Sequence, residues 1–166
     1  IALGNGRMYF VETNSPKAIA DTLGRMPVKT LFDGGNQYLV ALDIRTGQVI
    51  YKNKIDVSNF EEPVYLNFAK GIILLSGSKL DGDSIRYYYY AFDARSGETR
   101  WNVSHDSGLA IDGGHGEYNR NPTIVGNMVY AWPYAYNLIT GEKDQTWKFD
   151  RRGRGCGGVS ASAQCL

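Results

Sequence analysis

The sequence has little cysteine, almost no net charge and no long hydrophobic run. Two cysteines, Cys156 and Cys165, are too few for a disulfide framework or a structural zinc site, and the sequence does not decide whether they pair. Eighteen Lys and Arg residues against 17 Asp and Glu leave a net charge of +1, which gives no electrostatic reason to expect nucleic acid or an anionic membrane as a partner. No apolar stretch approaches the roughly 20 residues that a transmembrane helix needs. Composition therefore predicts a soluble globular chain.

What the sequence does contain in quantity is glycine and tyrosine. Twenty Gly and 12 Tyr among 166 residues favour many short strands joined by tight turns. The chain starts at Ile1 and passes at once into the alternating stretch 7–11. No signal or transit pattern precedes that stretch, so we expect either a removed leader or a piece of a longer chain.

A repeat organises the chain. Three segments, 38–51, 88–101 and 134–147, share one pattern: Ala, a large apolar residue, Asp or Asn, two variable positions, Ser or Thr, Gly, and then a strand-like stretch with an aromatic residue. The glycines are spaced by 50 and 44 residues (47 to 97 and 97 to 141). The repeat residues are Ala41, Asp43, Gly47 and Tyr51, then Ala91, Asp93, Gly97 and Trp101, then Ala135, Asn137, Gly141 and Trp147.

Each copy predicts a strand, a turn and a returning strand. The Asp or Asn side chain can accept hydrogen bonds from N–H groups two or three residues on, and the Gly supplies the positive φ that closes the turn. We call this turn the Asx–Gly corner. Segments 64–69 and 71–77 predict two further strands before the second copy, and 122–125 and 127–132 do so before the third. Tyr87–Tyr90 places rings on both sides of one strand, which predicts that both faces are covered.

Four antiparallel strands in each repeat of 44 to 50 residues are the plan of a β-propeller blade. The repeat resembles the PQQ-like repeats of the quinoprotein alcohol dehydrogenase-like superfamily, whose blades carry such a corner and a following Trp. The resemblance implies an all-β propeller of four-stranded antiparallel blades. It departs from the family at Tyr51, where Trp is usual, and at Asn137, after which the approach to Trp147 is longer.

The spacing predicts an incomplete propeller of about three to four blades, fewer than the roughly 4 to 8 blades of closed rings. We predict blade portions at about 1–58, 59–107, 108–150 and 151–166, all within one domain. Segment 6–12 is interpreted as a second strand with no first strand before it. The remainder of the propeller, or another protein chain, is the expected partner.

An insertion at about 13–36 is predicted to hold one short helix, with Ser15 as N-cap, Pro16 at its first position, and residues 17–23 forming two turns before Gly24.

The candidate chemistry is confined to loops. His105, Asp112, His115 and Glu117 are the candidate metal ligands, although their spacing matches no known motif and a solvated connection between blades explains the same residues at less cost. Residues 153–158 satisfy the GxGxxG spacing, but the strand-like sequence that follows argues against a nucleotide. Three arginines at 151–154 are interpreted as a flexible basic connection between blades. Residues 81–84 are interpreted as a hairpin tip, and residues 102–104 as a glycosylation sequon.

Function is predicted from the resemblance, because no catalytic or cofactor-binding residue can be assigned. The first hypothesis is a noncatalytic propeller segment that binds or scaffolds within a larger extracytoplasmic protein, periplasmic or secreted, with a small-molecule ligand as one option. The alternative is a fragment of a quinoprotein dehydrogenase, for which the family implies PQQ and calcium. A region appended to a larger extracytoplasmic enzyme is the third. The family's adjacent cysteines are missing from the sequence.

Overall fold

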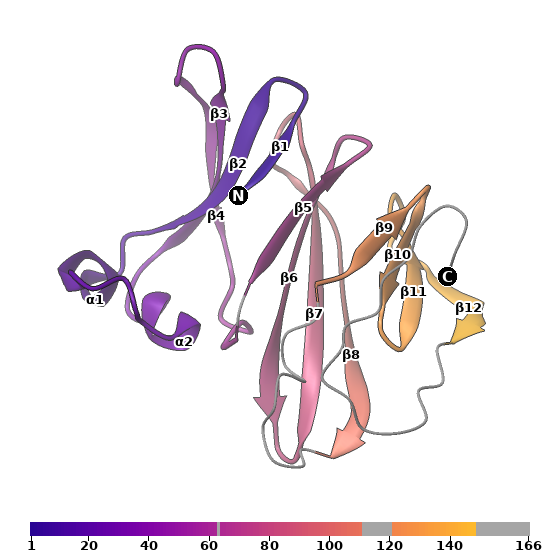
Figure 1. The fold of residues 1–166 in the computed structure, drawn as a ribbon. Helices are drawn as coiled ribbons and strands as arrows, with labels where there is room; N and C mark the ends of the chain where they lie inside the picture. The colour runs from indigo at the N-terminus through magenta and orange to yellow at the C-terminus, as the bar shows by residue number, and fades with distance from the viewer. Residues whose placement is uncertain (63, 111–120, 149–166) are drawn as a thin grey trace.

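The computed structural model describes residues 1–62, 64–110 and 121–148 and shows three four-stranded antiparallel sheets, which confirms the all-β prediction (Figure 1). The first sheet contains β1 (Ala2–Gly4), β2 (Arg7–Thr13), β3 (Gln37–Asp43) and β4 (Val49–Ile55). The second contains β5 (Tyr65–Ala69), β6 (Ile72–Asp81), β7 (Ser84–Asp93) and β8 (Thr99–Ala110). The third contains β9 (Thr123–Val125), β10 (Met128–Ala131), β11 (Tyr134–Asn137) and β12 (Lys143–Lys148).

Strand order follows chain order in every sheet, so each strand pairs with the next one in the sequence. The first strands of the first and second sheets meet, because β1 contacts β5. One expectation was wrong: segment 6–12 does have a first strand before it, since Leu3 of β1 pairs with Met8 of β2. A three-residue strand is too short to produce a visible alternation of apolar and polar residues.

The three Asx–Gly corners have the same geometry. The Oδ1 atoms of Asp43, Asp93 and Asn137 each accept a hydrogen bond from the backbone N–H three residues on, at 2.8, 3.0 and 3.1 Å. The following glycines have φ values of 71°, 74° and 75°, a left-handed conformation that glycine adopts without strain. Each corner is therefore built mainly from its own residues, and the N–H of the residue after the Asx donates one further hydrogen bond to the turn between the first two strands of its sheet.

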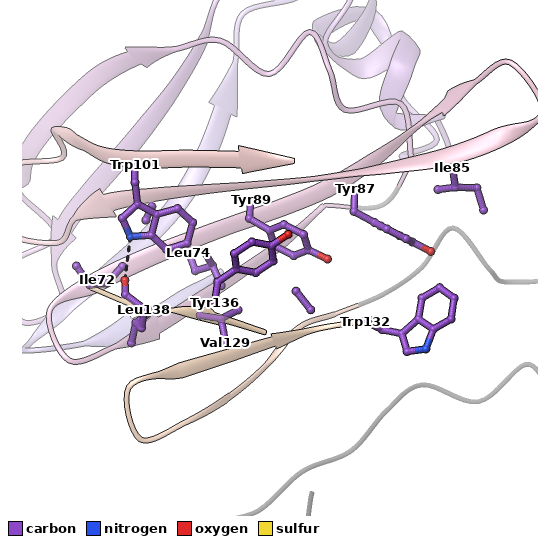
Figure 2. Close-up of a cluster of buried hydrophobic side chains, with 12 residues drawn as sticks. Ile72, Leu74, Ile85, Tyr87, Tyr89, Trp101, Val129, Trp132, Tyr136 and Leu138 are labelled. Carbon is purple, nitrogen blue, oxygen red and sulfur yellow. Dashed lines mark hydrogen bonds between the residues drawn. The ribbon is translucent and has the colours of Figure 1, made fainter. Parts of the chain in front are cut away.

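The second sheet is covered on both faces, which confirms the prediction from the tyrosine run. Tyr87 and Tyr89 point into the cluster shared with the third sheet (Figure 2). Tyr88 and Tyr90, the alternate residues of β7, pack against the cluster shared with the first sheet. The hydrophobic core of the described residues is thus two layers of side chains, one on either side of the second sheet.

Neighbouring sheets are joined by an aromatic side chain that lies on the next corner. A Cβ added to Gly97 would lie 2.5 Å from the Tyr51 ring, and one added to Gly141 would lie 2.7 Å from the Trp101 ring. Trp101 Nε1–H also donates to the Leu138 carbonyl at 3.0 Å, as Figure 2 shows. Glycine is needed at these two corners both for its φ and for the space that the rings occupy.

The insertion folds differently from the prediction, as two helices instead of one: α1 (Pro16–Ala20) and α2 (Val28–Leu31). Residue 21 ends α1 early, because its backbone is extended and its side chain accepts the N–H of Leu23, a local bond that competes with the helix. Ser15 precedes α1 but does not cap it with its side chain; its hydroxyl donates to the Asp33 carbonyl at 2.6 Å. Within the described residues, no helix is long and apolar enough to cross a membrane.

Candidate functional site

A hollow lies between the insertion and the loop that follows β4. Its volume is about 440 Å³, within the usual range for small-molecule sites. One wall comes from α2 and the residues after it, the other from residues 57–61. The lining residues are Lys29, Thr30, Phe32, Asp33, Gly34, Val57, Ser58, Phe60 and Glu61.

Both walls of this hollow, which we call the insertion pocket, are anchored to the sheets. Phe60 is 2% exposed and packs against Gly77 of β6, where an added Cβ would lie 2.9 Å from its ring. The N–H groups of Glu61 and Glu62 donate to the Ser78 carbonyl. On the other wall, the Gln37 side chain donates to the carbonyls of Phe32 and Gly35. The pocket is therefore preformed.

Charge is distributed across the mouth of the insertion pocket. Lys29 of α2 forms an ion pair with Glu61 at 2.9 Å, and Lys79 approaches the same carboxylate at 3.8 Å. Lys17 pairs with Asp33 at 2.5 Å and lowers the pKa of that carboxyl group. The half-buried Phe32 thus offers an apolar contact, backed by the buried Val57 and Phe60, with hydrogen-bonding groups at the rim.

A second hollow of about 330 Å³ lies between the first and second sheets, at their corner ends. It contains four cations, but the structure already uses three of them. Arg7 donates to the carbonyls of Ala94 and Arg95 at 3.0 Å. Lys70 donates to Asn127, and Arg100 pairs with Asp93 and, with the Ser96 N–H, lowers the pKa of Asp93 to about 2. We interpret this cleft as structural.

His105 lies in the aromatic layer between the second and third sheets and is 7% exposed. Its Nε2–H donates to the Trp132 carbonyl at 2.9 Å, so Nδ1 is the acceptor for the Tyr136 hydroxyl at 2.8 Å. The rings of Tyr89 and Tyr136 stack on it. Burial lowers the pKa of His105 to about 4. Both ring nitrogens are therefore engaged in holding two sheets together, with the imidazole neutral.

The other three predicted metal ligands, Asp112, His115 and Glu117, lie outside the described residues, so the structure does not test the predicted metal site. Among residues 1–62, 64–110 and 121–148, no three His, Cys, Asp or Glu side chains gather closely enough to hold a metal ion. The Trp101 indole packs on Gly141 and is 9% exposed, which leaves little of its surface for a flat quinone. The described residues consequently do not fit a quinone and calcium site, and no catalytic step is derived from one.

Further sequence predictions have mixed outcomes. Residues 81–84 form the expected hairpin tip, with Asp81 paired to Ser84 and Gly82 at a φ of 62°. The sequon residue Asn102 lies in β8 and is exposed. The glycine-rich segment 153–158, the arginines before it, both cysteines and the fourth blade portion lie outside the described residues.

Sequence reasoning missed the insertion pocket. It predicted an insertion at about 13–36 and assigned no role to residues 56–62. The signal that could have found it is Phe60, a large aromatic residue in a mostly polar loop, which indicates a loop packed on the core. Neither protein-family models nor curated proteins gave any match to the chain.

Proposed function

We propose that the chain is a noncatalytic binding or scaffolding module of PQQ-like propeller blades, working within a larger extracytoplasmic protein. The observation that supports it most is the repeated docking of an aromatic side chain on the next corner glycine, Tyr51 on Gly97 and Trp101 on Gly141. Such contacts give a stack of sheets with fixed spacing. A rigid stack with a loop insertion at one end is a common basis for a binding surface.

The binding place in this proposal is the insertion pocket. It is preformed, has the volume of a small-molecule site, and lies on the segment where the repeat pattern is interrupted. Its apolar walls and its Lys29–Glu61 rim would suit a compact ligand with both apolar and polar groups.

A binding experiment tests this directly. We would screen a panel of small aromatic and aliphatic fragments by ligand-observed NMR against the wild-type chain, Thr30→Trp and Thr22→Trp. The new indole at position 30 fills the pocket, whereas position 22 is an exposed residue outside the pocket lining and serves as the control. Fragments that bind wild type should be lost only with Thr30→Trp. Equal binding by all three chains would contradict the pocket.

The alternative, a quinoprotein dehydrogenase fragment, is tested separately. The chain is incubated with PQQ and calcium and examined for a quinone absorption band and for dye-linked alcohol oxidation. Under the proposed function neither appears. Oxidation that is lost when the quinone is removed would establish the alternative.

A further inference from the structure

The cleft of about 330 Å³ between the first and second sheets, which we call the corner cleft, holds more positive charge than its structural contacts cancel. Both sheets contribute cations to its lining: Arg7 of β2, and Lys70, Arg95 and Arg100 of the second sheet and its turns. The hydrogen bonds of Arg7 and Lys70 go to backbone carbonyls and to a side-chain amide, which are neutral acceptors. Such bonds orient a cation but leave its charge uncompensated.

Asp93 is the one carboxylate among the described residues that line the corner cleft, and it is matched by a single cation. Its side chain forms an ion pair with Arg100 at 2.5 Å. Among the residues that the structure describes, Arg7, Lys70 and Arg95 form no ion pair. Three uncompensated positive charges therefore share one cleft, in a chain whose total net charge is +1.

The corner cleft also contains a buried hydrogen-bond donor. Tyr9 of β2 lines the cleft and is 0% exposed, and its hydroxyl has no hydrogen-bond partner among the described residues. Burial raises the pKa of this hydroxyl group, and the nearby Arg7 guanidinium only partly opposes the rise, so the group is a neutral O–H donor. A buried polar group without a partner is uncommon in folded proteins and points to a ligand.

Lys70 has a backbone conformation that other residues adopt more readily. It lies in the two-residue turn between β5 and β6 with a φ of 48°, in the left-handed region. The equivalent turn of the first sheet, between β1 and β2, has Asn5 at a φ of 50°. Asparagine is several-fold enriched in this region and lysine is not. An unfavourable lysine on the lining of a cationic cleft points to a use for its charge.

We propose that the corner cleft binds a small inorganic oxyanion with two negative charges, phosphate or sulfate, which joins the first sheet to the second. Arg7 contributes from the first sheet, and Lys70 and Arg95 contribute from the second. Arg7 uses Nη1 for both of its carbonyl contacts, which leaves further N–H groups of its guanidinium for an oxyanion. The Tyr9 hydroxyl donates from the buried side. The bound anion removes the repulsion among the cations, so it adds to the structural role of the cleft.

The size and charge of the corner cleft decide the class of ligand. Its volume of about 330 Å³ lies at the lower end of the range for small-molecule sites, which suits a small ion. Three uncompensated charges favour a dianion over a monoanion such as acetate, because the attraction grows with the charge of the ligand.

Phosphorus NMR of inorganic phosphate tests binding directly. Titration against the wild-type chain, in chloride buffer at constant ionic strength, should broaden the phosphate signal in a saturable way. Lys70→Asn removes one charge and supplies a residue that suits the turn, and it should weaken phosphate binding about tenfold or more. Lys54→Asn is the matched control, because this exposed lysine of β4 lies outside the cleft lining. Equal binding by the two variants, or no binding by the wild-type chain, would overturn the proposal.

Urea unfolding in phosphate and in chloride tests whether the anion joins the sheets. A ligand that binds only the folded chain raises its stability with concentration, so phosphate should raise the urea midpoint of the wild-type chain. Phosphate and sulfate also stabilise proteins in general by exclusion from their surface, and the difference between Lys54→Asn and Lys70→Asn removes that effect. Tyr9→Phe keeps the ring that stacks on Phe68 and should lose part of the gain. Equal gains for the two lysine variants would contradict the proposal.

A comparison of anions identifies what the cleft accepts. Acetate that binds as tightly as phosphate would show that the cleft does not select a dianion, against the proposal. Binding of inorganic phosphate without phenyl phosphate identifies the free ion as the ligand, whereas binding of both shows that the site also takes a phosphate group on a larger molecule. None of these results affects the fragment and quinone experiments, so the proposals can fail separately.

Discussion

The two interfaces between neighbouring sheets use equivalent hydrogen-bond acceptors but different donors. Between the second and third sheets, the Trp101 indole donates to the Leu138 carbonyl at 3.0 Å in a buried contact. Between the first and second sheets, the Tyr51 hydroxyl reaches the equivalent carbonyl, that of Ala94, at 3.5 Å. In both interfaces the acceptor is a backbone carbonyl that the Asx–Gly corner holds in place. The donor can therefore vary without changing how the sheets stack.

The first interface compensates for its longer contact with additional donors. Asn53 donates to the Ser96 carbonyl at 2.9 Å, and Arg7 donates to the carbonyls of Ala94 and Arg95. The second interface has the buried His105 layer instead. One interface thus spreads its polar contacts over several partly exposed side chains, whereas the other concentrates them in two buried rings. The predictions below separate these two designs.

The largest effect is expected from removing the indole of the second interface. Trp101→Ala leaves a cavity over Gly141 and removes the bond to Leu138, so it should lower the free energy of unfolding by about 3–5 kcal/mol. Tyr51→Ala should cost less, because its ring is half-buried and Arg7 and Asn53 still join the sheets. Urea unfolding followed by circular dichroism measures both. Equal losses would show that the two interfaces do not differ in the way described.

Acid should weaken the second interface selectively. The folded pKa of His105, about 4, lies below its ordinary value of 6.5, so the unfolded chain takes up this proton first as the pH falls. The contribution is complete above pH 6.5 and is lost between 6.5 and 4, by up to about 3 kcal/mol. Unfolding free energies measured from pH 7 to pH 4 should therefore fall steeply.

The control for this pH dependence is His105→Gln, which cannot titrate and should flatten the slope between pH 6.5 and 4. The carboxyl group of Asp93 does not interfere, because the Arg100 side chain and the Ser96 N–H lower its pKa from 3.8 to about 2, and its loss falls below that window. An unchanged slope in His105→Gln would place the acid sensitivity elsewhere in the chain.

A pair of glycine substitutions compares a covered corner with the open one. Gly141→Ala imposes both a strained φ and a clash with the Trp101 ring, whereas Gly47→Ala, at nearly the same φ, imposes strain alone. The strain is worth about 1–2 kcal/mol, and the clash should add about 1–3 kcal/mol at position 141. The difference between the urea midpoints of the two variants measures the contribution of the contact between the Trp101 ring and Gly141. Equal losses would mean that the ring moves aside freely.

How far the sequence predicted this molecule depends on how local each feature is. The Asx–Gly corners were predictable because each is made by six consecutive residues, such as 43–48. The two-sided burial of β7 was predictable because Tyr87–Tyr90 alternate across one strand. The contact of Trp101 with Gly141 joins residues 40 positions apart, and no sequence period indicates which corner a ring will reach.

The candidate site was harder to predict for the same reason. Of the predicted metal ligands, His105 turned out to be neutral and buried, with its nitrogens bonded to Trp132 and Tyr136, and these partners lie on another sheet. The insertion was visible as an interruption of the repeat. Its pocket depends on Phe60, which is supplied by a different connection and meets the insertion only in three dimensions.

The smallest effect is expected at the tyrosine hydroxyl. Tyr51→Phe removes a contact of 3.5 Å, which is long for a hydrogen bond, so it should change stability by less than about 0.5–1.5 kcal/mol. Trp101→Phe removes a buried 3.0 Å bond and leaves the Leu138 carbonyl without its indole donor, so it should cost more.

Double-mutant cycles with Asn53→Ala should then show coupling at the first interface, where Asn53 and Tyr51 both contact Gly97. Trp101 and Asn53, which lie at different interfaces, should be additive. If Tyr51→Phe proves as damaging as Trp101→Phe, the hydroxyl is the main contact of the first interface and the two additional donors, Arg7 and Asn53, are secondary.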